Sequence, residues 1–119
     1  MGLFKRRSDG DIDAADLPTL AQDGVAIIDV RTPHEWAAGH LPFARHIPID
    51  QLLGRVGELD KDTLSVFICH VGARSLAASD ALGRNGYKTA NVPGGMEAAR
   101  KAGLPVVRGD GTPGAVIGA

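Results

Sequence analysis

The stretch Leu64-Ser65-Val66-Phe67-Ile68-Cys69-His70-Val71-Gly72-Ala73-Arg74-Ser75 decides the fold of this 119-residue chain. Residues 64–68 are apolar except for Ser65 and include β-branched and aromatic side chains, which predicts a central strand covered on both faces. Cys69 then lies at the carboxyl end of that strand, where open α/β sheets bind their ligands. The chain is therefore expected to be built around a buried strand that ends in a cysteine.

The residues after Cys69 predict a loop that surrounds its sulfur. Gly72 permits backbone angles that other residues resist, and a helical pattern follows over residues 74–82 until Asn85-Gly86 ends it. Free N–H groups of the loop and first helical turn should point at the sulfur and favour a thiolate. A buried core cysteine is the common alternative, but it requires no glycine loop and no following helix start. We therefore interpret Cys69 as a nucleophile.

The rest of the chain alternates between strand and helix patterns. Apolar runs predict strands over residues 25–30, 44–47 and 87–92. Helices are expected over residues 13–21, 33–38, 50–59 and 96–102, the second with a capping box formed by Thr32 and Glu35. Strands separated by helices favour parallel pairing with right-handed crossovers. The expected fold class is α/β, with a mainly parallel central sheet of about five strands and helices on both faces.

Composition limits the function classes. The net charge of −1 gives no reason to expect nucleic acid or an acidic membrane as a partner, and no apolar run approaches membrane-spanning length. The one cysteine excludes an intrachain disulfide, and four scattered histidines show no metal-ligand spacing, so we expect no metal and no cofactor. An unpaired reactive thiol fits a reducing compartment, which predicts a cytoplasmic location.

Three segments are expected along the chain. Residues 1–11 carry three basic side chains and are interpreted as a flexible basic tail. Residues 12–107 form the one folded domain that this length favours. Residues 108–119 are rich in glycine and are interpreted as a second flexible tail.

Four motifs in order resemble those of single-domain rhodaneses, the thiosulfate:thiol sulfurtransferases. The motifs are Ile28-Asp29-Val30-Arg31 with Glu35-Trp36, Gly39-His40-Leu41-Pro42, Cys69-His70-Val71-Gly72-Ala73-Arg74-Ser75, and Gly94-Gly95-Met96 with Ala102-Gly103-Leu104-Pro105-Val106. The resemblance covers roughly residues 12–107. Two residues depart from the family pattern: Phe43 replaces the usual glycine of the turn, and Ala99 replaces the usual tryptophan of the closing segment. Both departures bear on stability more than on the chemistry of the cysteine loop.

The resemblance implies a rhodanese-like domain in which Cys69 takes a sulfane sulfur from thiosulfate or a persulfide donor. Cyanide or a thiol then accepts that sulfur, and a sulfur-relay protein is a further candidate partner. The loop residues expected to bind substrate and persulfide are His70, Val71, Gly72, Ala73, Arg74 and Ser75. The resemblance also implies supporting roles behind the loop for Asp29, Arg31 and Glu35.

The residues alone leave several roles open. Arg74 either attracts an anionic donor or pairs with a carboxylate such as Glu35 or Asp29 and holds the loop. His70 either tunes donor choice or faces solvent, and His40 is expected to fix its turn. Asp29 with Arg31 is alternatively a surface ion pair worth about 0–1 kcal/mol.

Three rival function classes deserve comparison with sulfur transfer. A cysteine phosphatase uses a C-x5-R loop, whereas Cys69 and Arg74 are spaced as C-x4-R. A thiol–disulfide or arsenate reductase usually requires a resolving cysteine, which this chain lacks. A rhodanese-like sulfur-carrier or protein-binding module shares the same motifs, so the sequence does not separate it from an enzyme.

Overall fold

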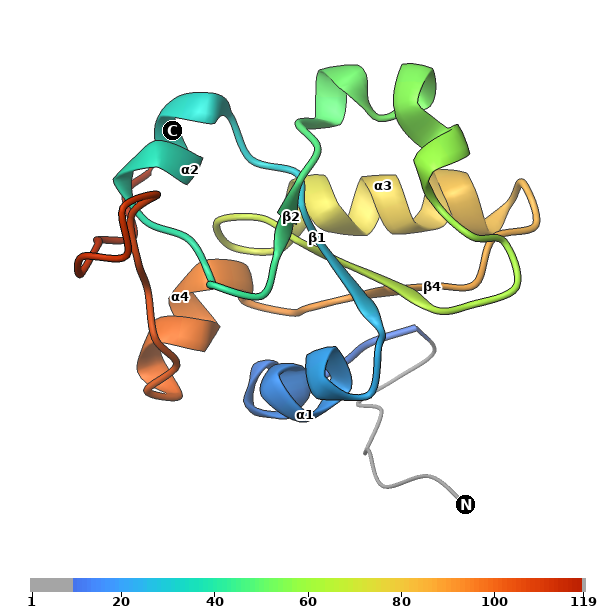
Figure 1. The fold of residues 1–119 in the computed structure, drawn as a ribbon. Coiled ribbons are helices and arrows are strands. Elements are labelled where there is room, and N and C mark those ends of the chain that lie inside the picture. Colours follow the sequence, from blue (N-terminus) through green and yellow to red (C-terminus); the bar gives the residue numbers. More distant parts are fainter. Residues whose placement is uncertain (1–9, 119) are drawn as a thin grey trace.

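Four parallel strands form the central sheet of the computed structural model, which describes residues 10–118. In chain order they are β1 (Ala26–Asp29), β2 (Arg45–His46), β3 (Ser65–Ile68) and β4 (Thr89–Asn91). The spatial order is β2-β1-β3-β4, which places the cysteine strand β3 between two neighbours (Figure 1). A single parallel bridge from Asp11 to Asn91 extends the β4 edge. The predicted α/β class is confirmed, with four strands and this bridge in place of about five.

Helices cover both faces of the sheet. Helices α1 (Leu17–Gln22) and α4 (Gly95–Lys101) lie on one face with the 3-10 helix η1 (Ala14–Asp16). Helix α3 (Ala73–Gly83) lies on the other face with the 3-10 helices η2 (Ile49–Gln51) and η3 (Leu53–Glu58) (Figure 1). Helix α2 (Pro33–Ala38) follows β1, and the predicted Thr32–Glu35 capping box is present at its start.

Alternation along β3 divides the core into two clusters and decides where the cysteine points. Val66 and Ile68 pack with the α1 and α4 side, whereas Phe67 and Cys69 pack with the α3 side. All four are fully buried, as expected for a strand covered on both faces. Because Cys69 continues this alternation, its side chain faces the helix that follows its own loop.

One predicted helix is wrong in type. The α-helix expected over residues 50–59 is two 3-10 helices, and Leu53, an apolar residue of this segment, is 76% exposed. Gly54 and Gly57 interrupt this segment, and glycine is a poor α-helix former. Leu52 and Leu59 are nevertheless buried against the α3 side of the sheet, so the segment still covers that face.

The two atypical positions are accommodated in the core. Ala99 is fully buried in the cluster on the α1 and α4 side, and Phe43 packs against the same cluster while partly exposed. Val116, from the segment after the expected domain end, packs there too.

The glycine-rich segment after Arg108 contacts the domain through its backbone. The Gly114 N–H donates to Val106 O and the Ala115 N–H donates to Ala38 O, both at 2.9 Å. A Cβ at Gly39 would overlap the backbone of Ala115, so the close approach requires glycine. Mobility of residues 108–119 stays a prediction, and the basic tail falls largely on residues 1–9, outside the described residues. Within residues 10–118, no helix is long and apolar enough to cross a membrane.

Candidate active site

Cys69 follows β3 directly and lies at the carboxyl end of the sheet. Its side chain is fully buried, and its sulfur accepts a hydrogen bond from the Gly72 N–H at 3.1 Å. Gly72 adopts a left-handed conformation (φ 112°) and is the N-cap residue of α3. A side chain on a residue with this φ would be strained, which explains the glycine. The predicted N–H donor to the sulfur is therefore present at Gly72.

Ser75 supplies a second contact to the sulfur. Its fully buried hydroxyl oxygen lies 3.3 Å from Cys69 Sγ, in the first turn of α3. The same oxygen lies 2.5 Å from Oδ1 of Asn91, on the neighbouring strand β4. Asn91 is 5% exposed and was not among the predicted site residues.

The start of α4 fixes the loop from the other side. The Met96 N–H donates to Cys69 O at 2.8 Å, and the Glu97 N–H donates to His70 O at 3.2 Å. A Cβ at Gly95 would overlap both of these carbonyl oxygens, so the closing segment meets the loop only through a glycine. The Gly94-Gly95-Met96 motif thus has a physical role in holding the backbone next to Cys69.

The two loop residues after Cys69 differ in their surroundings. His70 Nε2 lies 3.0 Å from Oε2 of Glu97. The other carboxylate oxygen, Oε1, accepts hydrogen bonds from Arg100. These bonds, led by the one from His70, lower the pKa of Glu97. Val71 has no such support and is 58% exposed. The loop therefore presents an apolar side chain to solvent beside a histidine that is held in place.

Arg74 pairs with Glu35 rather than standing free. Its guanidinium donates to both carboxylate oxygens at 2.7 and 2.8 Å, and Glu35 is fully buried while the Arg74 side chain is 30% exposed. Hydrogen bonding from Arg74, with further bonds from Thr32, lowers the pKa of Glu35 to about 2 against the opposing effect of burial. The same pairing raises the pKa of Arg74. Of the two carboxylates considered from sequence, Glu35 is the partner.

Asp29 and Arg31 form a separate ion pair at the end of β1. Both side chains are fully buried, and the Arg31 guanidinium donates to Asp29 at 2.8–3.1 Å and to Gly39 O at 2.8 Å. The alternative of a surface ion pair is therefore wrong. Nη1 of Arg31 is the one buried side-chain nitrogen or oxygen within residues 10–118 that lacks a hydrogen-bond partner. These two residues hold β1 to the turn at Gly39, whereas Glu35 hydrogen-bonds directly to Arg74 of the loop.

Three aromatic rings stack near this turn. Trp36 lies between His40, with ring centroids 3.6 Å apart, and His46, with centroids 4.8 Å apart. His40 Nδ1 is 2.8 Å from Trp36 O, in agreement with a role in fixing the turn. Among the described residues, no group of three or more His, Cys, Asp or Glu side chains is arranged to hold a metal ion.

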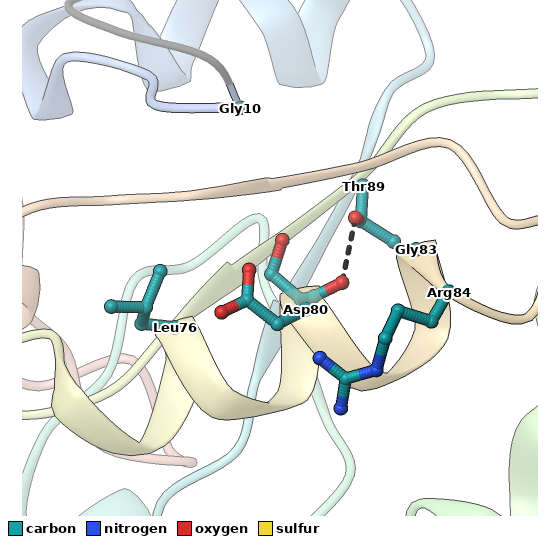
Figure 2. Close-up of a pocket in the computed structure, with 7 residues that line it drawn as sticks. Gly10, Leu76, Asp80, Gly83, Arg84 and Thr89 are labelled. Carbon is teal, nitrogen blue, oxygen red and sulfur yellow. Dashed lines mark hydrogen bonds between the residues drawn. The ribbon is translucent and has the colours of Figure 1, made fainter.

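Pockets lie along α3 and next to its first turn. One, of about 310 Å³, runs along α3, where Figure 2 shows Leu76, Asp80 and Arg84 on the helix and Gly10 across from them. None of its lining residues belongs to the cysteine loop. Another, of about 270 Å³, is lined by Arg74 together with residues at the end of β1 and around Pro48. Arginine side chains line both pockets, including Arg84 in the first and Arg74 in the second, but only Arg74 belongs to the cysteine loop, which makes the second pocket the better candidate for an anionic ligand of this site.

The structure brings most of the predicted loop together and adds residues that the sequence did not indicate. Asn91 and Glu97 contact Ser75 and His70 over 16 and 27 residues of chain. The available signal was position. Asn91 is the last residue of the neighbouring strand β4 and Glu97 follows that strand, whose carboxyl end lies beside that of β3 because the strands are parallel. Local sequence patterns do not show which side chains make these contacts, because the contacts depend on tertiary packing.

Comparison with known proteins gives three related findings. The chain is 36% identical over 104 residues to a "Sulfurtransferase" of Allochromatium vinosum, covering 85% of this chain and 97% of that protein. It is 32% identical over 94 residues to the "Putative sulfur carrier protein YrkF" of Bacillus subtilis, covering 78% of this chain but 45% of that protein. The crystal structure of a rhodanese-related protein from Thermoplasma volcanium superposes with a TM-score of 0.74 at 34% identity, covering 82% of this chain and 96% of the other.

A family model described as "Rhodanese-like domain" matches residues 13–102, which include the cysteine loop, the Arg74–Glu35 pair and the α4 segment that holds the loop. The match covers most of the chain and ends where the domain's last helix ends. The chain therefore belongs to the rhodanese-like family.

Proposed function

We propose that this protein is a sulfurtransferase that carries a sulfane sulfur on Cys69. The observation that supports this most directly is the position of the chain's one cysteine: at the carboxyl end of β3, with the Gly72 N–H and the Ser75 hydroxyl beside its sulfur. Such donors stabilise a thiolate and the negative charge of a persulfide without a metal or cofactor.

The proposed reaction has two covalent steps. The Cys69 thiolate attacks the sulfane sulfur of thiosulfate, a new S–S bond forms, and the bond to the sulfonate sulfur breaks, so that sulfite leaves with the electron pair. Cyanide or a thiolate acceptor then attacks the outer sulfur of the persulfide. The Cys69 thiolate is regenerated, and the product is thiocyanate or an acceptor persulfide.

Arg74 provides positive charge near the loop for the anionic donor. Its guanidinium is pinned by both oxygens of Glu35, yet 30% of the side chain is exposed. A planar guanidinium that is fixed on one edge can still present its other N–H groups to an anion. We infer that Glu35 positions Arg74 and that Arg74 favours thiosulfate or another anionic donor over neutral ones.

A sulfur-carrier or protein-binding module is the second candidate. The name of the Bacillus subtilis relative supports this candidate. Val71 supports it too, because this apolar loop side chain, two residues after Cys69, is 58% exposed. In that case Cys69 accepts sulfur from one protein and delivers it to another, with little free-standing thiosulfate activity. Either function requires a reduced thiol, so we propose a cytoplasmic location.

Steady-state assays with thiosulfate and cyanide, followed by a panel of thiol acceptors, separate the two candidates. Turnover with thiosulfate supports the enzyme, and persulfide formation without turnover supports the carrier. Intact mass should rise by one sulfur atom after incubation with thiosulfate or a persulfide donor, and Cys69→Ser should prevent this. If the Cys69→Ser variant still turned over thiosulfate, the proposed mechanism would be wrong.

A further inference from the structure

The buried side-chain amide of Asn91 lies next to Ser75 and has no role in the proposed reaction steps. The Asn91 side chain extends from the end of β4 to within 2.5 Å of the Ser75 hydroxyl oxygen, which in turn lies 3.3 Å from Cys69 Sγ. Exposed fractions are 5% for Asn91 and 0% for Ser75 and Cys69. The three side chains therefore form a hydrogen-bonded row that solvent scarcely reaches.

A serine hydroxyl carries one hydrogen, and three acceptors compete for it here. They are Asn91 Oδ1 at 2.5 Å, Gly72 O at 3.2 Å and Cys69 Sγ at 3.3 Å. While the amide oxygen faces Ser75, the shortest bond takes the hydrogen, and the sulfur faces a hydroxyl lone pair. That arrangement suits a protonated thiol, whose S–H donates to the oxygen, and disfavours a thiolate.

If the Asn91 side-chain amide rotates by half a turn, the directions of the hydrogen bonds along the row reverse. The amide nitrogen then donates to the Ser75 oxygen, which releases the single hydroxyl hydrogen toward the sulfur. A thiolate is a charged acceptor and attracts that hydrogen more strongly than the neutral Gly72 carbonyl does. Because an amide offers a donor and an acceptor at one place, asparagine suits both directions of the row.

We propose that Asn91 is a positioning residue whose amide sets the direction of the Ser75 hydrogen bond, so that the hydroxyl donates to Cys69 when the sulfur is anionic. This inference rests on the proposed function, since it assigns the row to the charge changes of the nucleophile. Asn91 acts through Ser75 and touches no substrate.

The backbone of Asn91 is fixed independently of its side chain. Its N–H donates to Gly10 O at 2.6 Å, its carbonyl accepts from the Ile12 N–H at 2.8 Å, and its residue pairs with Phe67 in the sheet. Substitution of the side chain leaves these main-chain bonds available. A change in the row can thus be separated from a change in the sheet.

The test is a titration of the chain's one cysteine by ultraviolet thiolate absorbance, with the profile of the Cys69→Ser variant subtracted. Ser75→Ala should move the midpoint upward by about one pH unit, the loss of one hydrogen bond to a charged group. Asn91→Ala should move it in the same direction by a smaller amount, because the Ser75 hydroxyl still reaches the sulfur but loses the amide N–H donor that strengthens its hydrogen bond to the thiolate. In the Ser75→Ala background, Asn91→Ala should add no further shift, because the row is already broken. Ser79→Ala, another buried serine on α3 one turn further along, is the matched control and should leave the midpoint unchanged.

Two outcomes would overturn the proposal. One is an Asn91→Ala variant whose Cys69 titration midpoint equals that of wild type. The other is an Asn91→Ala substitution that shifts the midpoint by the same amount whether residue 75 is serine or alanine. If Asn91→Ala unfolds, Asn91→Asp keeps the size and offers only acceptors, and it should raise the midpoint further than Ser75→Ala does in a protein with native circular dichroism. The titration requires no sulfur donor. Failure of wild-type protein to form a persulfide would therefore count against the proposed function, while the titration would still decide the role of Asn91.

Discussion

Two buried or partly buried arginine–carboxylate pairs differ in the burial of their side chains and in the sequence separation of their partners. Asp29 and Arg31 are two residues apart and both are fully buried. Glu35 and Arg74 are 39 residues apart, and only the carboxylate is fully buried. The first pair joins β1 to the Gly39 turn, whereas the second joins α2 to the cysteine loop. Their comparison separates a pair that holds the fold from one that holds the site.

The largest effect is expected from breaking the buried pair. Asp29→Ala leaves the Arg31 guanidinium charged and without its carboxylate in the core, which should lower the free energy of unfolding by about 3–5 kcal/mol. Denaturation by urea measures this. Glu58→Ala, at a surface pair whose side chains are 40–49% exposed, is the matched control and should change little. A loss no greater than that of the control would show that the Asp29–Arg31 pair does not hold the fold.

The second effect is acid sensitivity at Glu35. The pKa of Glu35 is lowered from 4.5 to about 2, so the folded state binds fewer protons than the unfolded state between these values. This contribution is fully present above pH 4.5 and is lost as pH falls through about 2. It amounts to at most about 3 kcal/mol.

Comparison of wild type with Glu35→Gln isolates this contribution from those of other carboxyl groups. The variant should be less stable at neutral pH, and the difference should narrow as pH falls from 4.5 toward 2. Urea midpoints across that range measure it. A difference that stayed constant with pH would mean that Glu35 is not held ionised by Arg74.

The third effect is kinetic. Arg74→Ala removes the exposed charge beside the loop and should raise the KM for thiosulfate about tenfold, the equivalent of one weak charge-assisted contact. Maximal turnover with cyanide should change less, since many acceptors are not anionic. Arg55→Ala, a surface arginine paired with Glu58, is the control. An unchanged KM together with a large loss of thermal stability would assign Arg74 to holding the loop alone.

Local patterns predicted much of this architecture. The strand that ends in Cys69, the Gly72 loop, the α3 start and the Thr32–Glu35 capping box depend on residues close together in sequence, and the structure has them where they were expected. Hydrophobic period and capping chemistry act within a few residues, so they are visible in the chain itself. The 3-10 form of η2 and η3 was missed because glycines weaken an α-helix whose apolar spacing is otherwise acceptable.

Contacts between distant segments account for what the sequence left open. Asp29 and Glu35 were both candidates for Arg74, and only the packing of α2 beside the loop selects Glu35. Burial of the Asp29–Arg31 pair was likewise left open, because charged residues at the end of a strand are usually solvated, whereas the family resemblance implied a supporting role behind the loop. Asn91 gave no signal beyond its place at the end of a strand parallel to β3.

The smallest expected effect concerns the local support of Glu35. The Thr32 N–H and hydroxyl both donate to Glu35 Oε1, at 3.0 and 3.1 Å, and the Glu35 N–H donates to the Thr32 hydroxyl oxygen at 3.2 Å. Thr32→Val keeps the shape but removes the hydroxyl, which should cost about 0.5–2 kcal/mol as the loss of a helix cap. Both Arg74 bonds to Glu35 remain, so the KM for thiosulfate should stay within about twofold of wild type, less than the loss of one hydrogen bond would change it. Urea denaturation and steady-state kinetics on the same preparation test the two halves together. A raised KM with unchanged stability would contradict this expectation, because it would show that the Thr32–Glu35 capping box supports the site and not helix α2.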